Sequence, residues 1–528
     1  MSESKAMPDW PVPRSWNRVR IGDVLSLVNG FAFKPSHWKK EGLPIVRIQN
    51  LNNQEAPYNY CTDSIPEKFR VEHGDLLFAW SGTPGTSFGA HIWRGGSAWL
   101  NQHIFRIDFS EKLFDRRFLR LAINANLADY IASAHGGAGL AHITIGKFRN
   151  SVLLLAPFNE QARIVAEIEK QFTRLDAAVA ALKRVQANLK RYRAAVLKAA
   201  CEGRLVPTEA ELARKEGRTY ETGEQLLARI LKQRRAKWEA DQLAKMQLGG
   251  KLPKNVDWKR TYKEPGLPDA IDLTALPAGW VWARAEQICD FITKGTTPSS
   301  DKLFEGSGDV PFIKVYNLTN RGALDFTVNP TFIGKATHTR ELARSLVRPG
   351  DVLMNIVGPP LGKVSIVPNL FPEWNVNQAI AIFRPVPGVD RRYLAALLLC
   401  DDILRWAIRR AKATAGQFNL TLEICRDLPL PLPPVDEQAR IVEALDACLS
   451  AAESSEHTLE TNVQRSDRLR QSILKRAFEG KLVPQNPNDE PASRLLERIQ
   501  AEKASRKTQG PLSQSRKRRQ DVASLEVQ

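Results

Sequence analysis

The sequence has few cysteines for its length, and none stands in a pair that could hold a metal ion. The six cysteines among the 528 residues lie far apart, at Cys61, Cys201, Cys289, Cys400, Cys425 and Cys448. Zinc sites and disulfide frameworks both depend on closely or regularly spaced cysteines. We therefore expect no metal site and no disulfide bond, and we interpret the isolated cysteines and histidines as packing or surface residues.

Long apolar runs are missing as well. No stretch comes near the length of a membrane span, and the N-terminal stretch Met1–Trp16 is polar, with prolines at Pro8, Pro11 and Pro13. A membrane-spanning helix needs about 20 mostly apolar residues, and a secretory signal needs a shorter apolar core. The sequence therefore predicts a cytoplasmic protein that does not enter a membrane.

Acidic residues are too few to balance the basic ones. There are 58 Asp and Glu against 76 Lys and Arg, which leaves a net charge of +18 and a pI near 9.7. A basic surface attracts polyanions, and nucleic acid is the commonest such partner. An acidic protein partner, or solubility alone, would fit the same charge. The chain is long enough for two or three domains.

Motifs for catalysis are also lacking. The segment Gly358-Pro-Pro-Leu361 has neither the polar residue nor the ring of an adenine-methyltransferase loop, and Gly136-Gly-Ala-Gly139 is too short for a dinucleotide loop. The lysine at Lys363 follows a glycine at the wrong spacing for a phosphate loop. We find no nuclease signature and no Ser/His/Asp arrangement, so we expect this chain to be non-catalytic.

What is present is an internal repeat. Pro157 begins PFNEQARIV and Pro434 begins PVDEQARIV, while Leu197 begins LKAACEGRLVP and Leu474 begins LKRAFEGKLVP. Both pairs are offset by 277 residues, so the two copies have equal length. Identity is concentrated at the two ends and the middles differ. Equal length around a differing middle is typical of a spacer.

Each copy predicts a long helix with the apolar seam of a coiled coil. The first helix should end at Gly203 and Pro207 and the second at Gly480 and Pro484. Gln186 and Arg193 interrupt the first seam and Glu456 the second. At about 1.5 Å per residue each helix would span about 60 Å. We favour an antiparallel pair over ordinary bundle helices. The seam positions are Ile168, Phe172, Leu175, Val179, Leu182, Leu189 and Val196 in the first copy, and Leu445, Leu449, Ala452, Leu459, Val463 and Ile473 in the second.

The segments before the two helices repeat more faintly, in the same order. Short alternating strands, glycine turns and one or two helices in each suggest an α+β domain. Two copies of one scaffold with divergent surfaces suggest two readers of different targets, although duplication without new function would also explain the divergence. The matching pairs include Pro13-Arg-Ser-Trp16 with Pro277-Ala-Gly-Trp280, residues 44–51 with 311–318, 73–78 with 349–354, Asn101-Gln102 with Asn377-Gln378, 115–119 with 390–394, and 139–149 with 416–426.

The helix-end motifs EGRLVP207 and FEGKLVP484, each after a helix opened by EQARIV, resemble the shared regions of type I restriction–modification specificity subunits. The stretch Thr222-Gly-Glu-Gln-Leu-Leu-Ala-Arg-Ile230 is similar to the central region of that family, and residues 478–499 to its distal region. The resemblance implies two α+β target recognition domains joined by two long antiparallel coiled-coil spacer helices. The expected division is 1–156, first recognition domain; 157–207, central spacer helix; 208–276, charged and partly helical linker; 277–432, second recognition domain; 433–484, distal spacer helix; 485–528, C-terminal segment and basic tail.

The resemblance also implies a mechanism. Each domain would read one half of a bipartite site in double-stranded DNA, and the helices would hold the halves at a fixed separation. The helices and their flanks would dock two modification subunits, which use S-adenosylmethionine to methylate adenine, and restriction subunits that use ATP and Mg. No cofactor would bind this chain itself. A stand-alone repressor-like DNA-binding protein and a coiled-coil scaffold without DNA are the alternatives.

Base and phosphate contacts need Lys, Arg, Asn, Gln and hydroxyl side chains on loops that reach the DNA. Four loops in each half supply such residues: 29–34, 49–53, 80–86 and 135–144, then 294–300, 316–321, 355–363 and 414–421. Asn101-Gln102 and Asn377-Gln378 recur in both halves, so a scaffold role is at least as plausible there. The candidate DNA-binding residues are Lys34, Gln49, Asn50, Trp80, Ser81, Thr83, His135, His142, Thr144, Lys294, Thr296, Thr297, Tyr316, Asn317, Asn355, Lys363, Gln417, Asn419 and Thr421.

The residues expected to build the spacer and to dock partners lie on the two repeated helices. They include the repeated glutamine and isoleucine of the EQARIV motif together with the apolar seam. The full set is Gln161, Ile164, Ile168, Phe172, Leu175, Val179, Leu182, Leu189 and Val196 in the first copy, and Gln438, Ile441, Leu445, Leu449, Leu459 and Ile473 in the second. The basic tail at Arg516-Lys-Arg-Arg519 is expected to be solvated.

Overall fold

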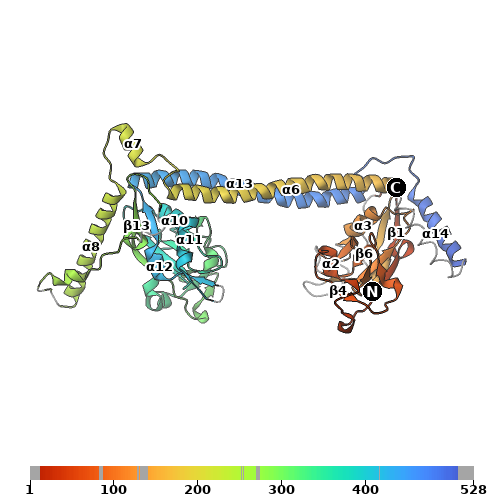
Figure 1. Cartoon of the computed structure of the whole chain (residues 1–528), viewed down its shortest axis with the longest axis horizontal. Coiled ribbons are helices and arrows are strands. Elements are labelled where there is room, and N and C mark those ends of the chain that lie inside the picture. Colours follow the sequence, from red (N-terminus) through yellow and green to blue (C-terminus); the bar gives the residue numbers. More distant parts are fainter. Residues whose placement is uncertain are drawn as a thin grey trace. The chain divides into compact units, whose positions relative to one another are not determined.

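A computed structural model describes residues 12–82, 87–127, 130, 141–250, 253, 255–268, 274–414 and 417–508. The chain forms two compact units that do not follow its linear order. Unit 1 joins the residues up to Leu182 with those from Thr461 onward, and unit 2 runs from Lys183 to Glu460. Each unit therefore contains one α+β domain, the first part of the helix that follows this domain, and the last part of the other long helix (Figure 1).

The first domain, in unit 1, is built on two four-stranded sheets with strand orders β2-β10-β6-β8 and β4-β3-β9-β5. Helix α3 begins at Asp115, whose side chain accepts hydrogen bonds from the backbone N–H groups of Arg117 and Phe118. The elements are β1 Asn17–Arg20, α1 Ile21–Val24, β2 Ser26–Asn29, β3 Leu43–Val46, α2 Ile48–Asn52, β4 Asn59–Cys61, β5 Arg70–Val71, β6 Leu76–Ala79, β7 Ser81–Gly82, β8 Gly89–Ile92, β9 Ala98–Leu100, β10 Ile104–Asp108, α3 Arg116–Ala125, β11 Ala141–His142, α5 Ile145–Asn150 and β12 Val152–Leu155.

The second domain, in unit 2, repeats this plan with additions. Its larger sheet has the order β14-β23-β19-β21-β17, and its smaller sheets have the orders β15-β18-β16-β22, β20-β25-β24 and β13-β26. The repeat and the α+β class therefore match the prediction. The elements are β13 Val281–Arg284, α9 Ala285–Ile288, β14 Cys289–Lys294, β15 Phe304–Glu305, β16 Val310–Ile313, β17 Gly322–Ala323, β18 Thr331–Ile333, β19 Val352–Asn355, β20 Val357–Gly358, β21 Val364–Ile366, β22 Asn375–Val376, β23 Ile380–Pro385, α10 Arg391–Leu399, α11 Asp401–Arg410, β24 Lys412–Thr414, β25 Gln417–Asn419, α12 Leu422–Asp427 and β26 Pro429–Leu432.

The two predicted long helices are α6, Phe158–Cys201, and α13, Val435–Phe478, and we call them the spacer helices. Each has 44 residues, which corresponds to about 66 Å at 1.5 Å per residue. Gly203 and Gly480 follow their ends with φ of 65° and 68°, a left-handed conformation that glycine adopts at low cost. The prediction of two equal helices that stop at these glycines is confirmed.

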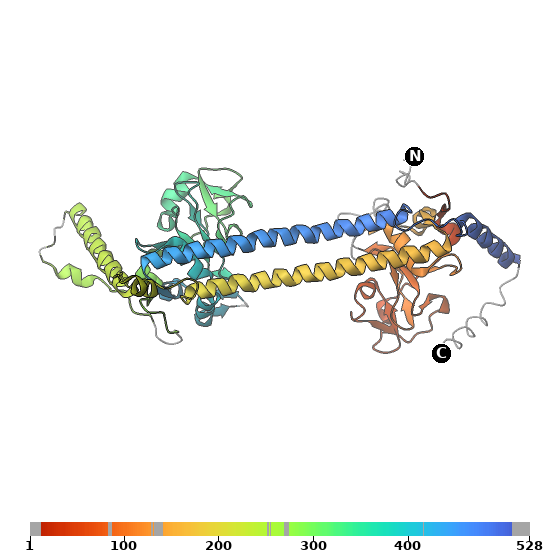
Figure 2. The same cartoon turned by 90° about the horizontal axis from the view of Figure 1, so that it is seen from above.

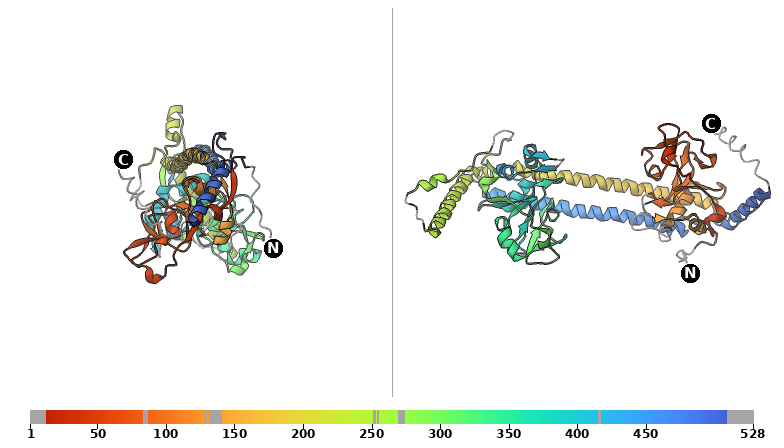
Figure 3. Two further views of the ribbon diagram at one scale, coloured as in Figure 1. Left: turned by 90° about the vertical axis from the view of Figure 1, so that its right-hand side faces the viewer. Right: turned by 90° about the horizontal axis from the view of Figure 1, so that it is seen from below.

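Within each unit the start of one spacer helix lies beside the end of the other (Figures 2 and 3). In unit 1 Arg470 of α13 forms an ion pair with Asp176 of α6 and lies over the ring of Phe172, 5.0 Å from its centre. In unit 2 Arg193 Nη1 of α6 lies 3.4 Å from Glu456 Oε2 of α13. The helices therefore run antiparallel, as predicted. The polar residues that interrupt the two seams at Arg193 and Glu456 pair with each other.

The core of each domain continues into the spacer helices. In unit 1 Ile164, Val165 and Ile168 are buried together with Phe478 against the first domain, and in unit 2 Ile441 and its neighbours are buried against the second. Further along the seam, side chains such as Leu175 and Leu459 are only half-buried. Burial of apolar surface therefore anchors the ends of the spacer helices more strongly than their middles.

The linker after α6 is folded onto the second domain. It contains α7, Glu209–Glu216, and α8, Gly223–Leu248, which begin at the side-chain caps Thr208 and Thr222. Within unit 2, α8 lies on the same side of the helix pair as the second domain, and α7 on the other side (Figure 1). In unit 1 the segment after α13 forms α14, Ala492–Thr508. Among the described residues, no helix is long and apolar enough to cross a membrane.

Candidate nucleic-acid interface

Short strand pairs bring two of the four predicted loops together in each domain. In the first domain β7 pairs with β11, so Ser81 lies opposite His142. In the second domain β20 pairs with β25, so Val357 lies opposite Asn419. The described ends of loops 80–86 and 135–144 therefore meet, as do those of loops 355–363 and 414–421. Each domain thus gathers polar loops from distant parts of the sequence at one place.

A close backbone approach fixes the first loop of each domain against the repeated Asn-Gln turn. A Cβ atom on Gly30 would lie 2.0 Å from the carbonyl oxygen of Asn101, and one on Gly295 would lie 2.3 Å from that of Asn377. Only glycine fits these contacts. The side chain of Asn101 accepts a hydrogen bond from the Gln102 N–H at 2.9 Å. A scaffold role for these turns therefore has direct structural support.

Several of the predicted DNA-binding residues are exposed on their domains. Tyr316 is 40% exposed, and its hydroxyl donates to the carbonyl of Asn329, which holds the ring in place at the surface. The Lys314 ammonium lies 5.9 Å from the centre of this ring. The exposed candidates are Lys34, Gln49 and Thr144 in the first domain and Lys294, Thr297, Tyr316, Asn419 and Thr421 in the second, while Trp80, Thr296 and Lys363 are half-buried.

Four of the predicted DNA-binding residues are buried, and for these the structure corrects the prediction. Asn50 and Asn317 are both fully buried, and their side-chain oxygens accept hydrogen bonds from the N–H groups of Arg47 and Lys314. Asn355 is fully buried too, while Ser81 is 5% exposed. A buried amide that already has its hydrogen-bond partners cannot contact a base edge without unfolding the turn around it. These residues are structural.

Asn50, Asn317 and Asn355 each close a turn. The amide of Asn317 donates to the carbonyls of Asp325 and Val328 at 3.0 and 2.8 Å. The amide of Asn355 donates to the carbonyl of Pro360 at 2.8 Å, and its oxygen accepts from the Lys363 N–H at 2.6 Å. An asparagine that closes a turn and an asparagine that contacts a base are both expected in polar segments after a strand. The sequence pattern therefore could not separate the two roles.

Other candidates have a role inside their own domain. Thr144 and Thr421 are the N-caps of α5 and α12, at equivalent places in the two domains. Thr296 accepts a hydrogen bond from Arg344 Nη2 at 3.0 Å, and Thr297 contacts Gln378. These contacts hold the loops in place. Thr83 and His135 lie outside the described residues, as do the side chains of His142 and Gln417.

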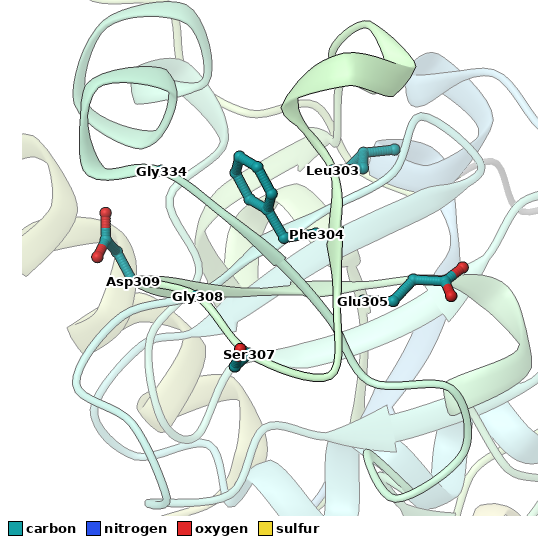
Figure 4. Close-up of a pocket in the computed structure, with 7 residues that line it drawn as sticks. All are labelled: Leu303, Phe304, Glu305, Ser307, Gly308, Asp309 and Gly334. Carbon is teal, nitrogen blue, oxygen red and sulfur yellow. The ribbon is translucent and has the colours of Figure 1, made fainter.

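A shallow hollow in the second domain does not suit DNA. It is lined by Leu303, Phe304, Glu305, Ser307, Gly308, Asp309 and Gly334 (Figure 4). Two of these residues carry carboxylates, which repel phosphate. Asp309 also accepts a hydrogen bond from the backbone N–H of Lys335 at 3.0 Å, so its carboxylate serves the local turn. We therefore do not place a phosphate group in this hollow.

The repeated EQARIV motif joins each domain to its spacer helix. Trp16 Nε1 donates to Glu160 Oε2 at 3.0 Å, and Trp280 Nε1 donates to Glu437 Oε1 at 2.9 Å. Both glutamates are buried, and burial raises the pKa of each above the ordinary value, although the tryptophan hydrogen bonds oppose this effect. The Pro-x-x-Trp motif and the first glutamate of EQARIV are therefore two parts of one contact.

The glutamine of the motif is internal, which corrects its assignment to partner docking. Gln438 accepts from the Asp390 N–H at 2.8 Å and donates to the carbonyls of Gly388 and Pro433, each at 3.1 Å. Gln161 makes the equivalent three contacts in the first domain. Ile164, Ile168, Ile441 and Leu445 are likewise buried in the domain cores. These residues build the junction and are not free to bind a partner.

The arginine of the motif reaches an acidic residue after the other spacer helix. Arg163 Nη2 lies 2.6 Å from Asp489 Oδ2 in unit 1, and Arg440 Nη1 lies 2.7 Å from Glu209 Oε2 in unit 2. Glu209 also pairs with Arg218, so it has two cationic partners. Each domain junction therefore clamps the start of one helix to the segment after the other. This clamp could not be predicted from the sequence, because the acidic partners Asp489 and Glu209 differ in residue type and in position relative to the helix ends.

Within the described part of the chain, no group of three His, Cys, Asp or Glu residues is placed to hold a metal ion. The six cysteines are free thiols, and five are buried. The hydrogen bond between Cys201 and Cys400 raises the pKa of Cys201 and lowers that of Cys400.

Comparison with known proteins relates this arrangement to one family. The model of the type I restriction modification DNA specificity domain matches residues 13–190 and 277–465, which are the two domains with parts of the spacer helices. The chain is 28% identical over 506 residues to the EcoBI specificity subunit of a type I restriction enzyme from Escherichia coli. The match covers 93% of this chain and 93% of the relative. It is 23% identical to the EcoKI specificity subunit of Escherichia coli strain K12, covering 94% of this chain and 97% of the relative.

A solved chain from a study of complex assembly and conformational transition of the type I R-M system has the same fold. The TM-score is 0.60 at 17% identity, over 89% of this chain and 99% of the other. Because the family match covers both domains and more than half of the residues, membership does not depend on a single motif. The chain belongs to the type I restriction modification DNA specificity domain family and is the specificity subunit of a type I restriction–modification system.

Proposed function

We propose that this chain reads a bipartite DNA target, with one half-site for each domain, for partner subunits that carry out the chemistry. The observation that carries the proposal is the duplicated junction. Two equivalent domains are attached by the same contacts to the starts of two antiparallel helices of equal length. A rigid helix of fixed length between two readers would fix the number of unread base pairs between the half-sites.

The exposed loop residues are the proposed DNA contacts. Lys34 and Lys294 occupy the first loop of their domains and would contact phosphates, which give affinity without sequence information. Gln49 and Asn419 are exposed amides that would contact adenine. The net charge of +18 supports DNA as the partner, because a basic protein attracts the phosphates of DNA. The differences between the two loop sets would make the two half-sites different.

Partner subunits are proposed to dock on the exposed apolar side chains of the spacer helices. Val185 and Tyr192 of α6 and Leu469 of α13 are exposed by 45%, 45% and 43%. Large apolar side chains that stay exposed on a helix often mark a protein interface. Because the chain is internally repeated, it offers two equivalent sites, which fits two modification subunits. S-adenosylmethionine would bind those subunits, and ATP and Mg the restriction subunits, in a cytoplasmic complex.

The direct test is to express the chain with its modification subunits and map methylated adenines in the DNA of the host cell. We expect a bipartite motif with a gap of fixed length. Replacing residues 277–432 with the corresponding domain of a relative should change one half-site and leave the other. A continuous motif, or methylation that does not depend on this chain, would contradict the proposal. Tight specific binding by the chain alone, without partners, would favour a repressor-like protein.

The spacer role has its own test. One heptad is inserted into α6 within residues 172–189, and a matching heptad into α13, so that the antiparallel seam keeps its register. Seven residues lengthen a helix by about 10 Å, close to three base pairs of DNA at about 3.4 Å each. We expect the gap to lengthen by about three base pairs while both half-sites persist. An unchanged gap would exclude the helices as the ruler.

A further inference from the structure

We propose that Arg321 is a positioning residue that fixes the orientation of the second domain on the spacer helices and thereby restricts the gap between the half-sites. The inference rests on the proposed bipartite reading and adds a named determinant of gap length. Arg321 lies in the loop before β17, where its backbone N–H donates to Thr319 Oγ1 at 3.1 Å. This hydrogen bond holds the backbone of Arg321 in place within the loop.

The guanidinium of Arg321 reaches across to α13. Its Nη1 atom lies 2.5 Å from Glu453 Oε1, and its Nη2 atom lies 2.9 Å from Glu456 Oε2. Glu456 also pairs with Arg193 of α6, so one carboxylate links the second domain with both spacer helices. The side chain of Glu456 is only 17% exposed, which strengthens its interactions with the two cations relative to a fully solvated pair. A planar guanidinium with two acceptors has a defined orientation.

This contact lies further along α13 than the other polar attachments of the second domain. The junction holds the start of the helix through Glu437 and Gln438, and Arg392 Nη1 follows at 3.0 Å from Asp446 Oδ2. Glu453 and Glu456 follow Asp446 by seven and ten residues, which places them about 10–15 Å further along the helix axis. A body held only near one end of a rod can rock about that end, whereas an attachment further along the rod opposes the rocking. Arg321 therefore restrains the angle of the domain.

The equivalent position in the first domain is different. Residues 44–51 match residues 311–318, and three residues beyond this match the first domain has the uncharged Gln54 where the second has Arg321. Under the 277-residue repeat, Asp176 corresponds to Glu453 and Arg470 to Arg193. Asp176 pairs directly with Arg470 within the coiled coil. In unit 2 Arg321 of the second domain pairs with Glu453 and Glu456 of α13, so this domain takes part in the ion pairs between the two spacer helices. The restraint is therefore a property of the second domain.

The test uses the chain in complex with its modification subunits and DNA duplexes whose half-sites are separated by the normal gap or by one base pair more or fewer. The quantity measured is the ratio of the dissociation constants for altered and normal gaps. The variants are Arg321→Gln, Arg321→Glu, and Arg321→Glu combined with Glu453→Arg. The control is Lys302→Gln, which removes an ion pair with Glu341 of similar exposure inside the same domain.

We expect Arg321→Glu to reduce the discrimination between gaps about fivefold, since a partly exposed ion network contributes little more than a single-digit factor. Arg321→Gln should give a smaller reduction, Glu453→Arg should restore part of the loss, and Lys302→Gln should have no effect. If the Arg321 variants keep normal discrimination while binding remains bipartite, this inference is wrong and the proposed function stands. If affinity falls equally for all gaps, Arg321 contacts DNA instead. If the unaltered complex shows no gap preference, the proposed function itself fails.

Discussion

The two units attach their domains to the spacer helices with the same contacts, and the domains share a scaffold, yet their loops differ. Trp16 with Glu160 in unit 1 is matched by Trp280 with Glu437 in unit 2, and Gln161 is matched by Gln438. The loops that would meet DNA have little in common. The repeated motifs therefore encode attachment, so the loops that would read DNA can change without altering the position of their domain.

Each domain is also held by the helix after the other spacer helix, since Ala492 and Leu495 of α14 are buried in the core of the first domain, but the polar contacts of α8 in unit 2 extend further. In unit 2 the helix α8 holds the second domain as well, with Arg234 Nη1 donating to the Cys289 carbonyl at 2.7 Å and Lys237 Nζ lying 2.6 Å from Asp290 Oδ2. The ring of Trp238 stacks on Trp258, with centroids 6.0 Å apart, so the linker folds back on this helix. The second domain is therefore held at its junction, by α8 and through Arg321.

The largest expected effect comes from removing the junction glutamines. Gln161→Leu and Gln438→Leu each leave one N–H and two carbonyl groups without partners inside the protein. We expect each to lower the free energy of unfolding of its own unit by about 3 kcal/mol, from a penalty of about 1–3 kcal/mol for each group that stays buried. Denaturation followed by hydrogen exchange in residues 113–115 and 388–390 would assign the loss to a unit. A much smaller effect in one unit would show that the junctions are not equivalent.

A smaller and unequal effect is expected from the clamp arginines. Arg163→Ala leaves the 5% exposed Asp489 without its cation, whereas Arg440→Ala leaves Glu209 paired with Arg218. We expect a loss of about 2 kcal/mol for Arg163→Ala and about half of that for Arg440→Ala, below the full cost of a broken buried pair because both arginines are partly exposed. Urea titration of each variant measures this difference. Equal losses would contradict a role for Arg218.

The smallest effect concerns pH. Burial raises the pKa of Glu160 and of Glu437, so between the ordinary glutamate value, about 4.3, and the raised value the folded protein binds more protons than the unfolded chain. The contribution of these carboxyl groups to stability therefore falls as the pH rises through that window. Glu160→Gln and Glu437→Gln should flatten this part of the stability profile. Urea midpoints measured from pH 4 to 8 would check it, and an unchanged slope in both variants would exclude these groups as the cause.

The spacer could be predicted from the sequence because its signals are local. The heptad pattern, the equal 277-residue offset and the glycines at Gly203 and Gly480 lie within each helix or directly after it. The loop candidates were predicted less well. Asn50 and Asn317 stand in loop segments with suitable chemistry, yet both are fully buried in their turns. Their hydrogen bonds go to backbone groups of the same turns, and an asparagine that closes a turn has the same residue type as one that reads a base, so residue type alone could not separate these two roles.

Two α+β domains that alternate with two helices of one length could be predicted from the sequence, because periodicity, capping and repetition are carried by neighbouring residues. Which residues join the domains to the helices became visible only in the folded chain. Trp16 and Glu160 lie 144 positions apart, Arg163 and Asp489 lie 326 apart, and Arg321 reaches Glu453 across 132. Such contacts depend on the path of the whole chain, since charge and hydrogen-bonding capacity name a possible partner but do not say which one folding brings within reach.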